Sequence, residues 1–161
     1  IYTCKLVLEK ITKANKAQLE DFLTEAVRSI FIDRDYKIQL VLKEDTKRPG
    51  LELTLTESGV QQEITDAVGG GIISTLGLLL QIYFIEVYKL NKVMFIEEGL
   101  KEVSTGLNNE STESINYLDN LLLFLKYLAK EKKYSLVIVT HDNNVRQFAD
   151  KVYEVRLGRI V

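Results

Sequence analysis

The sequence is poor in the residues that build disulfide-bonded, metal-binding or flexible multidomain proteins. Among 161 residues there is one cysteine, Cys4, one proline and one histidine, and there is no tryptophan. A single cysteine excludes a disulfide within the chain and a cysteine-rich metal site, and it fits a reducing, cytoplasmic setting. Because proline is so scarce and no low-complexity linker or internal repeat occurs, we predict one domain.

Charge and hydropathy give no overall reason to bind nucleic acid or a membrane. The formal net charge is −2, so only a local patch could attract a polyanion or an anionic membrane. The longest apolar region, 72–87, is short for a membrane span, and we expect a buried core helix there and no membrane partner. It is interrupted by Ser74, Thr75, Gln81 and Glu86. Residues 1–10 do not have the pattern of a signal peptide, and a start without methionine leads us to expect a segment upstream.

Hydrophobic periodicity in the first part of the chain predicts a helix followed by a hairpin. Apolar residues between Leu19 and Ile30 recur at helical spacing, while the lysine-rich segment before them predicts that the helix leaves the core at its N-terminal end. Apolar and polar residues alternate in 36–40 and again in 51–56, on either side of the turn-prone segment 47–50. This pattern predicts an antiparallel hairpin with one face in water.

The second part of the chain predicts a parallel sheet. Two short apolar runs, Val93–Ile96 and Leu136–Val139, are typical of strands buried on both faces, and the apolar stripe at 115–128 predicts a helix between them. Strand, helix and strand in this order form a right-handed βαβ unit with parallel strands. A short helix at 143–150 and a closing strand pair at 152–161 follow. We therefore predict an α/β fold, with a largely parallel sheet flanked by helices and an antiparallel β-hairpin.

Polar residues follow both predicted strands at what should be one edge of the sheet. Glu97 and Glu98 end the first strand, and Thr140, His141 and Asp142 follow the second. Ligands of open parallel sheets collect at this carboxyl edge. In nucleotide hydrolysis one of two adjacent carboxylates can hold Mg²⁺, usually through water, while the other polarises the attacking water and a histidine bonds a terminal phosphate. Taken singly, the same residues fit an ordinary acidic loop and a loop histidine bonded to backbone groups.

A run of three glycines, Gly69, Gly70 and Gly71, stands directly before the apolar helix, which continues to about Lys89. A glycine run at a helix N-terminus leaves backbone N–H groups free to meet an anion, and the helix dipole assists. A flexible turn is the alternative interpretation, because glycine runs by themselves are a weak signal.

In this order and spacing, the motifs resemble the ABC-type ATPase heads of SMC-like proteins. That superfamily includes chromosome-structuring ATPases and double-strand-break repair ATPases, and this sequence looks most like its phage and bacterial members with a three-glycine signature. The resemblance covers nearly the whole chain, including Gln18–Glu20, Ile30–Phe31 and Tyr36. Its motifs are the signature loop at Val68–Gly71, the Walker B strand at Val93–Glu98, the D-loop at Lys101–Ser104 and the switch-histidine motif at Val139–Asp142.

The resemblance implies ATP and Mg²⁺ as cofactors and a role for each motif. Glu98 and His141 would be catalytic, Glu97 would hold the metal, and the ATP-binding residues would be Gly69, Gly70, Gly71 and Ser104. ATP-driven head dimerisation and hydrolysis would be coupled to DNA repair, recombination or chromosome organisation. The implied partners are the chain's own N-terminal P-loop lobe, a second head in a homodimer, and DNA with a nuclease or other DNA-processing protein.

The resemblance makes the whole chain, 1–161, a single C-terminal ATPase lobe. Its parts are a helix returning from a coiled coil at 1–31, the hairpin at 36–56, the signature and coupling helix at 69–90, and the segment from Walker B to the C-terminal strands at 92–161. No Gly-Lys pair occurs in the sequence, so the phosphate-binding motif G-x-x-x-x-G-K-[ST] is absent. We expect that motif in the N-terminal lobe of a longer protein; the alternative is a separate short protein that never had this lobe.

Four positions depart from the family pattern. The family usually has aspartate where Glu97 stands, proline where Gly99 stands, serine where Gly69 stands and arginine where Gln81 stands. These departures keep open a non-catalytic scaffold lobe that binds ATP or a partner. An unrelated βαβ regulatory domain is a third possibility, and it would lack the convergence of Glu98 and His141 on one sheet edge.

Overall fold

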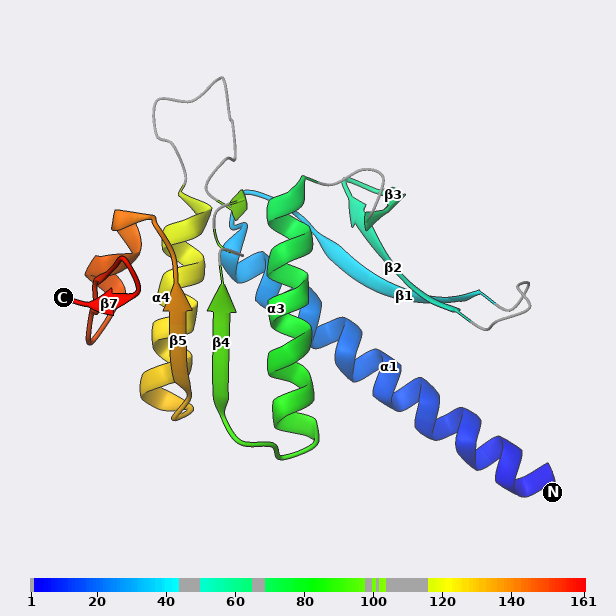
Figure 1. Cartoon of the computed structure of the whole chain (residues 1–161). Coiled ribbons are helices and arrows are strands. Elements are labelled where there is room, and N and C mark those ends of the chain that lie inside the picture. The colour runs from blue at the N-terminus through cyan, green and yellow to red at the C-terminus, as the bar shows by residue number, and fades with distance from the viewer. Residues whose placement is uncertain (1, 44–49, 65–68, 98–99, 101, 104–115) are drawn as a thin grey trace. The chain divides into compact units, whose positions relative to one another are not determined.

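A computed structural model describes residues 2–43, 50–64, 69–97, 100, 102–103 and 116–161. The chain forms two compact units, Ile1–Asn91 and Lys92–Val161 (Figure 1). The first unit contains a long helix, an antiparallel sheet and a second helix. The second contains a βαβ unit followed by a short helical turn and a hairpin.

The first unit is organised around helix α1, Tyr2–Ile30. Near its C-terminal end, Leu23, Val27 and Ile30 are fully buried. They recur at steps of three and four residues, so they line one face of the helix, and this end of α1 packs against the first strand of the sheet. The helix predicted between Leu19 and Ile30 is confirmed and continues upstream.

An antiparallel sheet follows α1, with strands in the order β1 (Lys37–Lys43), β2 (Gly50–Glu57) and β3 (Val60–Glu63). Ile38 in β1 pairs with Leu55 in β2, and both side chains are buried. The predicted hairpin is confirmed, while the turn predicted at 47–50 lies outside the described residues except for Gly50. Strand β3 was not predicted. It follows a tight turn in which Ser58 and Gly59 both have positive φ, 50° and 83°, as hairpin turns of two residues require.

Helix α3, Gly70–Val87, packs against α1 in the same unit. The rings of Phe22 on α1 and Tyr83 on α3 lie 5.6 Å apart between centroids. The buried side chains of α3 are Ile72, Thr75, Leu76, Leu78, Leu79 and Ile82. Among the described helices, α3 alone is long and apolar enough to cross a membrane, a test that the core helix of a soluble protein also passes.

The second unit begins with a βαβ unit made of β4 (Val93–Glu97), α4 (Tyr117–Glu131) and β5 (Ser135–Val139). The two strands pair in parallel along their whole length, as predicted. Helix α4 is capped by Asn116, whose side chain accepts the backbone N–H groups of Leu118 and Asp119 at 3.1 and 3.4 Å. Its apolar side packs against β5.

One face of the β4–β5 sheet stays exposed. Met94 and Ile96 are only 3% and 7% exposed, whereas Phe95 between them is 73% exposed. Val137 and Val139 on β5 are exposed as well. The prediction that these strands are buried on both faces is therefore wrong for this chain. The reason is that α4 covers one face, and no other described element of this unit covers the second.

The unit ends with the 3-10 helix η2, Asn143–Phe148, and a small hairpin of β6 (Val155–Arg156) and β7 (Arg159–Ile160). Leu157 and Gly158 have positive φ, 49° and 75°, and form the hairpin turn. Both the short helix and the closing strand pair were predicted from the sequence.

Candidate functional site

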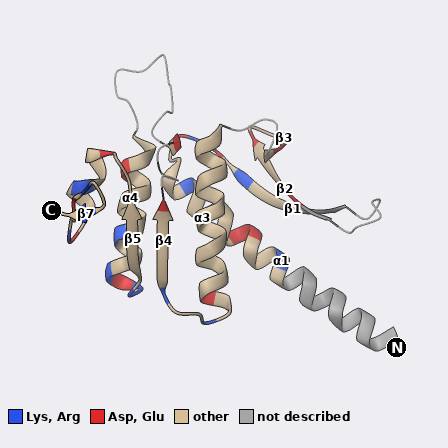
Figure 2. Cartoon of the chain, in the orientation of Figure 1, with Lys and Arg blue, Asp and Glu red and all other residues tan. Residues whose placement is uncertain are grey.

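Glu97 and His141 lie at the same edge of the parallel sheet. Glu97 is the last residue of β4 and pairs with Val139, the last residue of β5. His141 follows Val139 by two residues, so the parallel strands bring both side chains to their common carboxyl edge. Both side chains are exposed, and the charged end of β4 is visible in Figure 2. The carboxylate of Glu97 and the imidazole of His141 thus share the edge where ligands of such sheets bind.

Four predicted motif residues lie outside the described part of the chain: Val68, Glu98, Lys101 and Ser104; so does Gly99, which stands where the family usually has proline. Close to them in sequence, Leu100 and Val103 are buried at 4% and 2% exposure. The N–H group of Val103 donates to the carbonyl of Leu100 at 3.2 Å, which makes a single helical turn. Glu102, between these two apolar anchors, is exposed. The described part of the segment predicted as the D-loop, with Leu100 before it, is therefore held by its apolar residues.

The backbone on both sides of His141 is held by short polar side chains. Thr140 Oγ1 accepts the N–H of Asp142 at 3.0 Å, and Asp142 Oδ1 accepts the N–H of Asn144 at 2.8 Å, which caps η2. Val145 in η2 is buried, and η2 packs against α4. The turn that carries His141 is thus tied to the core through η2. The sequence prediction gave the Thr140 and Asp142 side chains no role, although these residue types bond nearby backbone at turns.

The glycine run lies at the N-terminus of α3 in the first unit. Gly69 is the N-cap residue, and no side chain caps this end of the helix. The first turn of α3 carries no acidic side chain, so the positive end of the helix dipole is not neutralised within it. Gly69 and Gly70 are exposed. Their backbone N–H groups have the chemistry of an anion site, which the sequence predicted for this segment.

The described residues fit Mg²⁺ and ATP only as part of a larger site. Among them, no group of three histidine, cysteine or acidic side chains gathers to hold a metal ion. A single carboxylate such as Glu97 still suits Mg²⁺, which is held in nucleotide sites by one or two carboxylates together with phosphate oxygens and water. The triphosphate itself needs a phosphate-binding loop, and this sequence has none. Glu97 and His141 can therefore contribute one side of such a site.

No family model matches the sequence, and no curated protein matches it. Among solved structures, the chain is similar to an SMC ATPase studied for ATP-driven dimerisation and DNA-stimulated activation, with a TM-score of 0.63 at 15% identity. That match covers 94% of this chain and 87% of the other. A second similar structure is the Smc head domain of Pyrococcus furiosus, with an extended coiled coil and bound to the C-terminal domain of ScpA. Its TM-score is 0.61 at 17% identity, over 89% of this chain and 34% of that one.

Two further Smc heads give the same result. The head of Pyrococcus yayanosii, with a coiled coil and joint, matches with a TM-score of 0.60 at 17% identity, over 98% of this chain and 31% of that chain. A head bound to the C-winged helix domain of ScpA matches with a TM-score of 0.60 at 18% identity, over 95% and 44%. The fold is thus that of SMC ATPase heads, and the chain spans less than half the length of three of the four matched chains.

Proposed function

We propose that this chain is the C-terminal half of an SMC-like ABC ATPase head, which hydrolyses ATP with Mg²⁺ once a P-loop lobe and a second head complete its site. One observation carries the proposal. Glu97 at the end of β4 and His141 just beyond β5 share one carboxyl edge in a fold similar to SMC ATPase heads. An ordinary acidic loop or a lone loop histidine has no reason to occupy that arrangement.

Each motif has one task in this proposal. Glu97 holds Mg²⁺ through water, and Glu98 takes the proton of the attacking water. His141 donates a hydrogen bond to the terminal phosphate, in a turn held by Thr140 and Asp142. The N–H groups of Gly69, Gly70 and Gly71 at the start of α3 bind the γ-phosphate held by the opposite head, and Ser104 of the D-loop contacts the nucleotide across the same interface.

The exposed face of the β4–β5 sheet supports the need for a second lobe. Parallel sheets occur almost only with both faces covered, yet Val93, Phe95, Val137 and Val139 are all exposed here. Complete burial of such a side chain is worth about 1.5–3 kcal/mol, so covering the exposed part of one that is 44–73% exposed is worth about 0.7–2 kcal/mol. We assign this face to the P-loop lobe of the same head. The larger length of the similar Smc heads is consistent with this, because their chains contain more than the part matched here.

The test uses the complete protein, with its P-loop lobe. Glu98→Gln should lower ATP turnover by at least about 10²-fold, because an amide cannot take the proton of the attacking water, and it should retain an ATP-bound dimer. The matched control is Glu131→Gln, the same substitution at the exposed end of α4. Unchanged turnover in Glu98→Gln would refute the assignment of this residue. Heads that stay monomeric with ATP in every variant would refute ATP-driven dimerisation.

A non-catalytic scaffold is the second candidate, and specific residues favour it. Glu97 is longer than the aspartate usual in the family, Gly69 offers no hydroxyl, and Gln81 is an exposed amide on α3 where the family usually has arginine. In this case the head would bind ATP and dimerise without turnover. Glu98→Gln would then leave both dimerisation and the negligible phosphate release unchanged, which separates the two candidates.

The biological setting belongs to the same proposal. We place the ATPase cycle in DNA repair, recombination or chromosome organisation, with DNA and a nuclease or other DNA-processing protein as partners, in the cytoplasm of a phage-infected or bacterial cell. DNA-stimulated activation is a property of one similar SMC ATPase. The corresponding test is the ATP turnover of the complete protein with and without duplex DNA, at fixed salt. Turnover that does not respond to DNA over a wide range of DNA lengths would count against this setting.

A further inference from the structure

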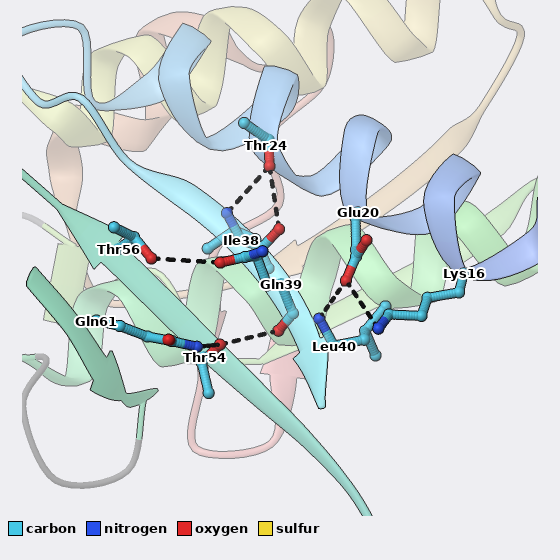
Figure 3. Close-up of polar contacts among 9 residues, drawn as sticks. All are labelled: Lys16, Glu20, Thr24, Ile38, Gln39, Leu40, Thr54, Thr56 and Gln61. Atoms are coloured by element: carbon cyan, nitrogen blue, oxygen red, sulfur yellow. Dashed lines mark hydrogen bonds and ion pairs between the residues drawn. The ribbon is translucent and has the colours of Figure 1, made fainter. Parts of the chain in front are cut away.

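Two side chains of α1 bind backbone groups at the free edge of β1 (Figure 3). The N–H of Leu40 donates to Glu20 Oε1 at 2.6 Å. The N–H of Ile38 donates to Thr24 Oγ1 at 3.0 Å, and the Thr24 hydroxyl donates back to the Ile38 carbonyl at 3.4 Å. Strand β1 is at the edge of the sheet, so these backbone groups have no strand partner. The helix supplies what a fourth strand would otherwise supply.

One helical turn further on, Arg28 makes a third contact of the same kind. Its Nε donates to the carbonyl of Tyr36 at 2.8 Å, and its guanidinium also pairs with Asp35. We call Glu20, Thr24 and Arg28 the edge row. Along this row the side chain of Glu20 only accepts hydrogen bonds, the hydroxyl of Thr24 both accepts and donates, and the side chain of Arg28 only donates.

The spacing of the edge row matches the spacing of the strand. Four helical residues advance about 6 Å along the axis. Two strand residues advance about 6.8 Å, and every second residue of an edge strand directs its N–H and C=O groups outward. The mismatch is therefore about 0.8 Å for each step, or about 1.6 Å across the row. The short Thr24 occupies the middle position, and the longer, more adaptable Glu20 and Arg28 occupy the ends.

The order of side chains in the row permits one axial register. If α1 slid by one turn toward the N-terminal end of β1, Lys16 would face the N–H of Leu40. If it slid by one turn the other way, Arg28 would face the N–H of Ile38. Lysine and arginine side chains have no acceptor, so either slip leaves one of these N–H groups unsatisfied. Within α1, Lys16 pairs with Glu20, four residues further on, at 3.7 Å.

We infer that the edge row is a register lock: it holds α1 at one axial position against β1, so that a displacement of α1 along its axis passes to the β1–β3 sheet. One-turn displacements of packed helices are a known means of conformational switching. In the sequence, Glu63 at the end of β3 stands six positions before Gly69. Any effect of such a displacement on ATP binding rests on the proposed function, in which α1 is the arm returning from a coiled coil. The register lock between α1 and β1 does not depend on the proposed function.

The experiment measures the position of α1 relative to the sheet in this chain, without nucleotide. Spin labels are placed at Asp21 on α1 and Gln62 on β3, both exposed, in a background that carries Cys4→Ser. Pulsed dipolar spectroscopy should give one narrow distance distribution for the otherwise unsubstituted chain. The double variant Glu20→Ala, Thr24→Val should broaden it or add a population displaced by about one helical pitch, 5.4 Å.

Two controls separate the hydrogen bonds from side-chain loss in general. Glu25→Ala makes the same substitution as Glu20→Ala at an exposed position of α1 outside the row, and it should leave the distribution narrow. The conservative pair Glu20→Gln, Thr24→Ser keeps an acceptor at each position and should also keep it narrow. An unchanged distribution in the Glu20→Ala, Thr24→Val variant would overturn the inference, because apolar packing of α1 alone would then set the register.

A second measurement decides the matter if that double variant does not fold. In the unsubstituted chain, the amides of Ile38 and Leu40 should exchange with solvent as slowly as those of Gln39 and Val41, which face β2 in the antiparallel ladder. In the single variant Thr24→Val, exchange at Ile38 should accelerate about 2- to 10-fold while Gln39 stays unchanged. Fast exchange at Ile38 and Leu40 in the unsubstituted chain would overturn the lock and would leave the ATPase proposal untouched.

Discussion

The exposed face of the β4–β5 sheet provides the sharpest test of the proposed P-loop lobe, through Phe95. Its side chain is 73% exposed, while its neighbour Met94 on the opposite face is 3% exposed. Complete burial of a phenylalanine side chain is worth about 1.5–3 kcal/mol, so covering the exposed part is worth about 1–2 kcal/mol. Phe95→Ala should therefore weaken association with a P-loop lobe about 5- to 30-fold, as measured by calorimetric titration of one lobe with the other.

The same substitution should barely change this chain alone. Phe95→Ala is expected to alter the free energy of unfolding in urea by no more than about 0.5 kcal/mol, whereas Met94→Ala should cost about 2–5 kcal/mol. Leu123→Ala, which shortens an exposed apolar side chain on α4, is the control for lobe association and should leave it unchanged. Two results would refute the reasoning. Either Phe95→Ala destabilises the chain as much as Met94→Ala, or it leaves the affinity between the lobes unchanged.

Three further changes test the helix ends and the turns. Asn116→Ala should lower the free energy of unfolding by about 1 kcal/mol, seen as a lower urea midpoint, because two N–H groups of α4 lose their acceptor; an unchanged midpoint would contradict this. Gly69→Ser should raise thermal stability slightly or not at all, since a Cβ there meets nothing within 4 Å and φ is −58°, and it should strengthen ATP-dependent dimerisation of the complete head in gel filtration. Weaker dimerisation would show that this position does not face the phosphate. Asp142→Ala should cost no more than about 1 kcal/mol of stability but lower turnover of the complete head at least about tenfold, because the turn that carries His141 loses its cap; equal turnover would make that turn irrelevant to catalysis.

The order and type of most elements followed from local patterns in the sequence. The periodicity of apolar residues was enough to predict the helix ending at Ile30, and short continuous apolar runs were enough to predict the strands around Phe95 and Val137. Strand β3 was not predicted from these patterns. Its central residues, Gln61 and Gln62, are neither β-branched nor aromatic, and its partner is β2 through the positive-φ turn at Ser58 and Gly59. That Ser-Gly pair was the available signal.

The error about the sheet faces has a physical cause that bears on function. Under the proposed function, a continuous apolar run such as Val93–Ile96 also includes the surface that the P-loop lobe would cover. The structure of this chain shows only what the chain itself covers, and Phe95 remains in water.

The edge row is the opposite case, because its contacts are present in the structure but were not predicted from the sequence. Glu20, Thr24 and Arg28 look in the sequence like a solvated polar face, because their partners are backbone groups, which have no sequence signature. The apolar pattern of the sequence therefore predicted burial of both sheet faces, of which this chain covers only one. It missed the polar contacts that set how α1 and β1 meet.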